Sequence, residues 1–173
     1  LQNVSPVHMS RNIRGVLWSK LAINCVITTL GAVTGQTLGQ MLRQKNIRRV
    51  FLAVYREVVD CAHRVGVKLE KIAAPPHLLY LRADAGAATR LYKDLLVVLV
   101  GLRYSRLRSS MLQSLERGRP TEIDYLNGYV VRQAEKVGLD VPVNRALVEL
   151  VKQIEAGERQ AEPANIADLV GLC

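Results

Sequence analysis

The stretch from Asn12 to about Leu30 is apolar almost all round, and this limits what the chain can fold into more than any other feature. Its apolar positions fall on every side of a helix: Val16, Leu17, Leu21, Ile23, Val26, Ile27 and Leu30. A helix with no polar side has to be buried. We therefore predict a central buried helix on which the rest of the chain packs.

The segments that follow repeat apolar residues at a helical period. One stripe ends near Gly66 and consists of Ile47, Val50, Phe51, Val54, Val58, Cys61, Ala62 and Val65. Later helices are predicted from about Ala87 to Leu102 and from Leu107 to Leu115. Another is predicted from Glu122 to about Val137, and a last one over Ala146 to Ile154. No segment alternates like a strand, so the predicted fold class is all-α.

The helix predicted from Glu122 has an expected start signal, with Thr121 as N-cap and Asp124 as its capping-box partner.

At 173 residues the chain fits one domain of ordinary size. We place the helical domain at 13–158, a linker from something upstream at 1–12 and a loosely held tail at 159–173. The first ten residues lack the order of a signal peptide.

The charge and the apolar runs of the chain bear on whether it binds nucleic acid or spans a membrane. The formal charge is +9 with a pI near 9.8, but the basic clusters Arg43–Arg49 and Arg103–Arg108 lack the interleaved aromatics of a single-strand binding groove. We interpret them as solvated helix faces with a weak bias toward anionic substrates, and expect no nucleic-acid partner. The longest strongly apolar run, Leu95–Leu102, is too short to span a bilayer.

The three cysteines, Cys25, Cys61 and Cys173, are widely spaced and lack metal-ligand spacing, which indicates a reducing cytoplasm and no metal site.

A polar stripe interrupts the first helix. Lys20, Asn24, Thr28 and Gly31 follow one another at steps of four, four and three, which places them on one face. Gly31, Gly35 and Gly39 also recur at steps of four, and this spacing allows either a close helix approach or a broken helix end.

Lys20 is the candidate for chemistry. A lysine on an apolar helix either extends its ammonium to solvent from a helix end or lines a polar cleft. In a cleft, desolvation lowers the pKa of the ammonium, so that it can protonate an alkoxide formed from a carbonyl substrate. Asn24, one turn on, offers both a donor and an acceptor, or is a satisfied core amide.

Two further groups have a chemical and a structural interpretation. Glu122 sits where a helix dipole keeps a carboxylate ionised, or simply compensates that dipole. Ser109 and Ser110 form a hydroxyl pair that suits a substrate carboxylate. The chain has no Gly-x-Gly-x-x-Gly fingerprint, so redox chemistry would need a second domain.

Three segments carry a family resemblance. Leu-Trp-Ser-Lys-Leu-Ala-Ile-Asn-Cys at 17–25, Ser-Ser-Met-Leu-Gln at 109–113 and Thr-Glu-Ile-Asp-Tyr-Leu-Asn-Gly at 121–128 resemble the signatures of ketopantoate reductases (2-dehydropantoate 2-reductases). Pro142 and Asn144 match the family's Val-Pro-x-Asn step. The resemblance runs from about Ile13 to about Ile154. It implies the helical C-terminal half of that family, a fold like the C-terminal domain of 6-phosphogluconate dehydrogenase.

The resemblance implies a reaction and roles. NADPH, held by an N-terminal Rossmann domain, would deliver hydride to the ketone of ketopantoate in a cleft against the helical domain, a cytoplasmic step of pantothenate biosynthesis. Lys20 would be the proton donor, Asn24, Thr28 and Ser110 would hold the substrate, and Glu122 would contact the nicotinamide side or orient Lys20. It also allows a homodimer and implies no membrane partner. The helical half alone is expected to be inactive.

Three positions depart from the family pattern: asparagines are expected at Thr28 and Leu38, and an aspartate at Ser114. Losing two amides fits a paralogue acting on another 2-keto acid about as well as ketopantoate itself. A non-catalytic helical interaction module is the remaining alternative.

Overall fold

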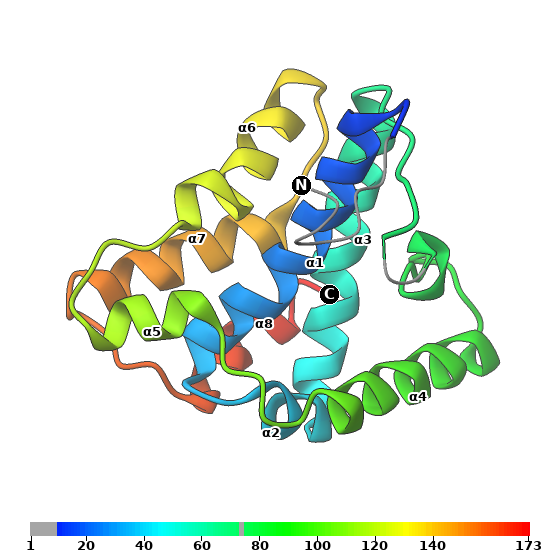
Figure 1. Cartoon of the computed structure of the whole chain (residues 1–173). Helices are drawn as coiled ribbons and strands as arrows, with labels where there is room; N and C mark the ends of the chain where they lie inside the picture. Colours follow the sequence, from blue (N-terminus) through cyan, green and yellow to red (C-terminus); the bar gives the residue numbers. More distant parts are fainter. Residues whose placement is uncertain (1–9, 73–74) are drawn as a thin grey trace, which may run out of the picture.

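The helix α1 (Ile13–Thr34) crosses the middle of the computed structural model, which describes residues 10–72 and 75–173 (Figure 1). Its N-cap, Asn12, accepts a hydrogen bond from the Gly15 N–H at 3.0 Å and donates to the Lys68 carbonyl at 2.8 Å. The start of α1 is therefore tied to the segment after α3 (Lys45–Arg64). Most of the expected upstream linker lies outside the described residues.

The helices α1 and α3 form the centre of the fold and run in opposite directions (Figure 1). The predicted stripe on α3 is confirmed, because Val50, Val54 and Val58 are fully buried beside Val26 and Leu30 of α1. The short α2 (Leu38–Arg43) joins the two helices. Although α1 is long and apolar enough to cross a membrane by length and composition, just over half of that stretch is buried inside the fold. This burial fits the predicted role of a core helix.

Two helices cover one side of the central pair. α7 (Pro142–Glu155) packs on both α1 and α3, and α6 (Asn127–Lys136) packs on α7 and α3. The rings of Trp18 and Tyr129 meet at 5.7 Å between centroids and join α1 to α6. The predicted last amphipathic helix is confirmed, with Leu147 and Val151 fully buried.

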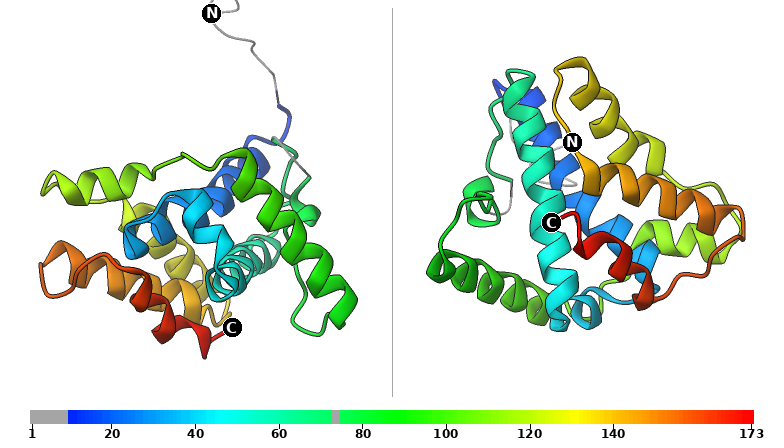
Figure 2. Two further views of the ribbon diagram at one scale, coloured as in Figure 1. Left: turned by 90° about the horizontal axis from the view of Figure 1, so that it is seen from below. Right: turned by 180° about the vertical axis from the view of Figure 1, so that it is seen from behind.

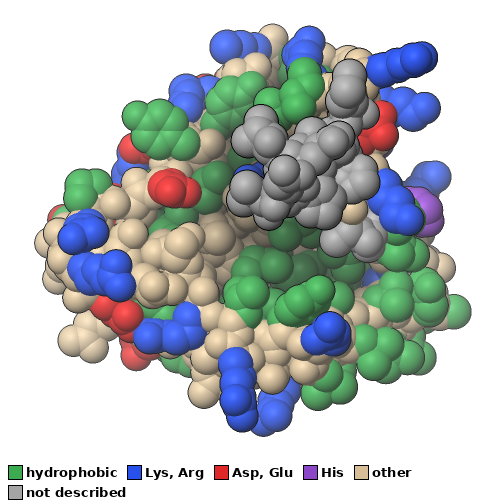
Figure 3. Space-filling model, viewed as in Figure 1, with side chains coloured by type: hydrophobic (Ala, Val, Ile, Leu, Met, Phe, Trp, Pro, Cys, Tyr) green, Lys and Arg blue, Asp and Glu red, His purple; other side chains and the backbone are tan. Residues whose placement is uncertain are grey.

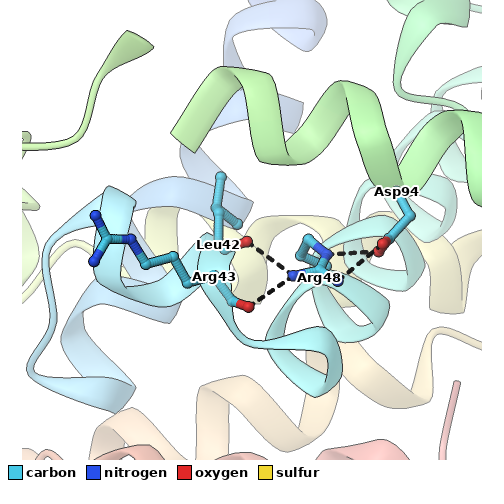
Figure 4. A network of polar contacts seen from close by, with 4 residues as sticks. All are labelled: Leu42, Arg43, Arg48 and Asp94. Atoms are coloured by element: carbon cyan, nitrogen blue, oxygen red, sulfur yellow. Dashed lines mark hydrogen bonds and ion pairs between the residues drawn. The ribbon is translucent and has the colours of Figure 1, made fainter. Parts of the chain in front are cut away.

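The helix α4 (Ala87–Arg103) lies across the N-terminal end of α3 (Figures 1 and 2). A short 3-10 turn, η1 (Pro76–Leu78), precedes it. The Arg48 guanidinium on α3 donates to both carboxylate oxygens of Asp94 on α4, at 2.6 and 2.9 Å, and to the carbonyls of Leu42 and Arg43 (Figure 4). One arginine thus connects α2, α3 and α4.

The predicted helix from Glu122 to Val137 is wrong at its start. A 3-10 turn, η2 (Ile123–Tyr125), comes first, and the chain then breaks at Leu126 (φ −103°, ψ −100°) before α6 begins. The Thr121 hydroxyl accepts only from the Ile123 N–H, and Asp124 pairs with Lys152 instead of closing a capping box. The break occurs because the Asn127 side chain is buried in contacts with other helices.

The predicted helix at Leu107–Leu115 begins later, as α5 (Ser110–Glu116). The residues before it form a turn at 104–106 and an irregular stretch at 107–109, where the Ser105 and Leu107 carbonyls accept from the Gly39 and Leu38 N–H groups of α2. This loop therefore packs on α2 instead of continuing a helix.

The C-terminal residues are packed, which corrects the expected loosely held tail. They form η3 (Pro163–Ile166) and α8 (Ala167–Val170). Ile166 and Leu169 enter the core, and the Asn165 amide donates to the Val33 carbonyl of α1 at 3.0 Å. A buried amide and two buried side chains hold the segment against α1 and α3. Within the described residues every regular element is helical, which confirms the all-α class.

Candidate functional site

Within the described residues, one face of α1 is left uncovered. Ile13 and Leu17 are 59% and 58% exposed, and Lys20 is exposed one turn further on. Asn24 and Thr28 continue this face and are half-buried. Helical spacing puts all five on one side of the helix, as the sequence predicts for its last three members.

The polar face of α1 ends at the start of α5. A Cβ on Gly31 would lie 2.7 Å from Ser109 Cβ, so the two elements touch where α1 has no side chain. Gly35 ends α1 in the left-handed conformation (φ 68°). The glycine spacing therefore serves both purposes that the sequence allowed, a close approach at Gly31 and a helix end at Gly35.

The two serines have different roles. Ser109 is buried, and its hydroxyl caps α5 by accepting from the Leu112 N–H at 2.9 Å. Ser110, the first residue of α5, is exposed. Ser110 is therefore the member of the pair that can meet a ligand.

Thr28 is restricted as a donor. Its hydroxyl donates to the Asn24 carbonyl at 2.6 Å. The Thr28 oxygen can still accept a hydrogen bond, but its proton is already used inside α1. Thr28 is thus suited to a hydroxyl on a ligand and poorly suited to a carboxylate.

Glu122 is exposed at the start of η2. Its main chain is fixed, because its carbonyl accepts from the Tyr125 and Leu126 N–H groups. The preceding residue is fixed as well, since the Thr121 N–H donates to a Glu155 carboxylate oxygen at 2.6 Å. Within the described residues no hydrogen bond or ion pair reaches the Glu122 carboxylate, which leaves it available to a ligand.

A buried polar network fixes the chain just after Glu122, and sequence reasoning missed this network. The Asn127 amide oxygen accepts from the Thr29 hydroxyl of α1 at 2.7 Å, and its nitrogen donates to Asn144 of α7 at 2.9 Å. Asn144 in turn donates to Glu57 of α3 at 2.8 Å. The only sequence signal for this network is that Asn127 and Asn144 lie in the family-like segments.

Glu57 is the charged member of the network. Its carboxylate accepts the N–H groups of Val143 and Asn144 at 3.0 and 2.9 Å, so a residue of α3 caps α7. Burial raises the pKa of Glu57 above its ordinary value, and the bonds from Asn144 and Val143 offset part of that rise.

The predicted residues lie on two neighbouring elements and one nearby turn. α1 supplies Lys20, Asn24 and Thr28, and α5, packed on α1, supplies Ser110. Glu122 precedes the residues that join α6 to α1. In the described part of the chain no hydrogen bond or ion pair joins Lys20, Ser110 and Glu122 to one another. Figure 3 shows the surface hollowed where α1 crosses this side of the molecule.

The structure shows where two of the positions that depart from the family pattern, Leu38 and Ser114, lie. Leu38, at the start of α2, is 1% exposed and belongs to the core, so it does not present a polar group. Ser114 is half-buried on α5. Among residues 10–72 and 75–173, no group of three or more His, Cys, Asp or Glu side chains is placed to hold a metal.

Comparison with known proteins supplies a family. Residues 12–155 match the family described as "Ketopantoate reductase PanE/ApbA C terminal". A 2-dehydropantoate 2-reductase of Archaeoglobus fulgidus is 30% identical over 141 residues, which are 82% of this chain and 40% of that protein. The chain spans less than half the length of the curated relatives it matches.

Solved structures share the fold. A ketopantoate reductase of the same family from Ralstonia eutropha superposes with a TM-score of 0.70 at 33% identity, covering 88% of this chain and 45% of that one. Two more distant structures, each at 18% identity and covering 87% of this chain, are similar in fold. They are a D-mandelate dehydrogenase with NADH (TM-score 0.67, 43% of that chain) and a dimeric Staphylococcus aureus ketopantoate reductase (TM-score 0.64, 46% of that chain).

Proposed function

The chain belongs to the ketopantoate reductase family, and on that premise we propose that it is the substrate-binding and catalytic half of a nicotinamide-dependent 2-keto acid reductase. The observation that carries the proposal is the uncovered face of α1. There the exposed apolar side chains of Ile13 and Leu17 precede Lys20 and Asn24 on the same side of the helix. Exposed apolar side chains grouped on one face mark a surface that another unit covers.

The unit that we propose to cover this face is a Rossmann domain of the same polypeptide. The curated relatives are more than twice as long as the stretch that matches this chain. A domain docked on Ile13 and Leu17 would close the polar part of the face into a cleft. Closure removes water from Lys20 and strengthens its interaction with a charge that develops on the substrate.

The proposed substrate is ketopantoate, which carries a carboxylate, a ketone and a hydroxyl. The Lys20 ammonium donates a hydrogen bond to the ketone oxygen and then transfers a proton to the alkoxide, giving pantoate. Asn24 and Ser110 bind polar groups of the substrate. Thr28, whose proton is held by the Asn24 carbonyl, accepts from the substrate hydroxyl.

The cofactor that we propose is NADP, and one residue of this chain fits a contact with it. Glu122 presents an exposed carboxylate that accepts no hydrogen bond from the described residues, as a partner for a carboxamide N–H or for Lys20. The bound nicotinamide supplies the hydride. The helical half alone, which holds no dinucleotide fingerprint, is expected to be inactive.

Location and assembly complete the proposal. Three free cysteines, two of them fully buried, support a reducing cytoplasm. A homodimer is supported by a stripe of exposed leucines on α4, namely Leu91, Leu95, Leu99 and Leu102, each at least half exposed. Figure 3 shows hydrophobic side chains gathered over α4. One structural neighbour is itself a dimer.

The test is an assay of the full-length polypeptide with NADPH, ketopantoate and a panel of other 2-keto acids. The proposal predicts NADPH oxidation, with the largest kcat/KM for ketopantoate. A larger kcat/KM for another member of the panel would assign the chain to a paralogue with that substrate. Intact NADPH binding without turnover of any 2-keto acid would contradict the proposal and favour a non-catalytic interaction module.

A further inference from the structure

A basic cavity of about 750 Å³ opens between α3, α4 and the segment 81–83. α1 contributes no residue to its lining, so the cavity is separate from the face that carries Lys20. Seen from behind, α3 lies in front of α1, with α4 on one side and the end of the chain beside it (Figure 2, right). Five cationic side chains line the cavity: Lys45, Arg49, Arg56, Arg82 and Arg90.

Most of this positive charge is not neutralised by carboxylates. Within the described residues, Lys45 and Arg56 make no ion pair or side-chain hydrogen bond. The Arg90 guanidinium is held by the carbonyls of Ala85 and Ala83, at 2.8 and 2.9 Å, and carbonyls leave its charge uncompensated. Arg49 donates to the main-chain oxygen of Cys173 at 3.0 Å, and among these five side chains only Arg82 has an acidic partner in the described part of the chain, the exposed Asp84.

The one acidic side chain in the lining, Asp94, is already paired with an arginine. Both carboxylate oxygens of Asp94 accept from Arg48, which lies outside the cavity lining (Figure 4). Arg48 therefore cancels the charge of Asp94, and four of the five lining cations, all except Arg82, are left to attract an anion. A concave site lined by one sign of charge concentrates ligands of the opposite sign.

The rest of the lining is largely apolar. Leu52 is buried in the wall, Leu81 is half-buried and Leu91 lies at the rim. Such a cavity suits a molecule that joins an apolar body to a multiply charged head. Guanidinium groups bind phosphate oxygens in pairs, and the volume lies in the range of small-molecule sites.

We propose that this cavity binds a soluble organic phosphate, with its phosphate among Lys45, Arg56 and Arg90 and its apolar body against Leu52 and Leu81. The proposal does not depend on the reductase activity, because binding is measured without a nicotinamide or a 2-keto acid.

The test uses the full-length polypeptide and 1-naphthyl phosphate as the probe, with binding measured by calorimetry. Inorganic phosphate supplies the charge alone, and 1-naphthol supplies the apolar body alone. The proposal predicts that 1-naphthyl phosphate binds about tenfold or more tightly than either. Equal affinity for 1-naphthol would mean that the arginines are not used and would overturn the proposal.

A variant pair locates the site. K45Q/R56Q removes two cations that make no described hydrogen bond, and we expect about a tenfold loss of affinity or more. The matched control R64Q/R117Q removes the same charge from two exposed arginines outside the lining and should change affinity less than about twofold. Equal losses in both variants would show a general charge effect and overturn the proposal.

Cys173 offers an independent readout. It lines the cavity and is half-buried, whereas Cys25 and Cys61 are fully buried. Saturating 1-naphthyl phosphate should slow alkylation of Cys173 by iodoacetamide in the wild type. An unchanged alkylation rate while the probe is bound would place the probe elsewhere and contradict the assignment.

Discussion

Glu57 performs for α7 the task that an N-cap side chain usually performs. α7 starts at Pro142 after Val141, which has no polar side chain, so the first N–H groups need an acceptor from another element. The Glu57 carboxylate supplies it and also binds the Asn144 amide. One carboxylate of α3 thus fixes the start of α7 and, through Asn144 and Asn127, the start of α6.

Glu57→Gln should therefore destabilise the fold. The amide has one oxygen where the carboxylate has two, so one N–H of α7 loses its acceptor while buried. We expect a loss of about 1–3 kcal/mol in the free energy of unfolding, measured by urea denaturation. Glu149→Gln, at an exposed position on α7, is the control. A loss no larger than in the control would refute the capping role.

The pH dependence of stability has a definite sign at this residue. Because the pKa of Glu57 is raised in the folded chain, the folded state holds this proton to higher pH than the unfolded state. Its contribution is fully present below the ordinary Glu pKa and is lost as pH rises through the raised value. As pH rises from the ordinary Glu pKa through the raised value, the wild type should lose more free energy of unfolding than Glu57→Gln. The opposite order would show that the hydrogen bonds outweigh burial.

At the scale of elements, the contact between α1 and α5 depends on one missing side chain. Gly31 lies where a Cβ would come within 2.7 Å of Ser109, and Ser109 is buried as the cap of α5. The contact sets the position of Ser110 relative to Thr28 and Asn24. The geometry of the proposed substrate site therefore depends on it.

Gly31→Ala should destabilise the chain by about 1–3 kcal/mol, although alanine is the better helix former. The methyl group would push Ser109 away and weaken the cap of α5. Gly171→Ala, at the C-cap of α8 with right-handed helical backbone angles and open space around it, should be close to neutral. Thermal unfolding of both variants tests this, and a stabilised Gly31→Ala would show that the two helices separate at little cost.

Periodicity in the sequence predicted the helices whose apolar residues recur at regular steps along the helix itself. α1, α3, α4 and α7 carry apolar stripes along their whole length, and their positions are confirmed. The start of α6 could not be predicted, because the Thr121 and Asp124 pattern was overridden by contacts of Asn127 with residues 98 and 17 positions away. The packed C-terminal turns depend in the same way on Val33, far back in the chain.

The candidate site was also predictable from local sequence patterns only in part. The step pattern of Lys20, Asn24 and Thr28 placed them on one helix face, and the structure agrees. Their grouping with Ser110 and Glu122 came from the family resemblance, since no local pattern joins residues of α1 with the start of α5 and the start of η2, far along the chain. The basic cavity was equally hidden, because its arginines come from three separate segments.

At the scale of the whole molecule, α4 is the element with the most exposed apolar surface. Its inner side holds only Lys93, Val97 and Gly101 as buried residues, while four leucines face outward. Such a stripe on one copy can pack against the same stripe on a second copy around a two-fold axis.

Leu95→Asp/Leu99→Asp should convert the proposed dimer of the full-length protein into a monomer, because a buried unpaired carboxylate opposes association. The molar mass is measured by analytical ultracentrifugation. Leu172→Asp changes an exposed leucine away from α4 and should leave the mass unchanged. A wild type that is already monomeric, or a double variant that remains dimeric, would refute this interface.

We place the proposed reaction at the exposed face of α1 around Lys20. Its most direct test is the turnover of the full-length polypeptide carrying Lys20→Ala, with ketopantoate and NADPH, beside Lys136→Ala as an exposed control on α6. We expect kcat to fall about 100- to 10,000-fold in Lys20→Ala and to stay near the wild-type value in the control. A Lys20→Ala enzyme with wild-type kcat would contradict it.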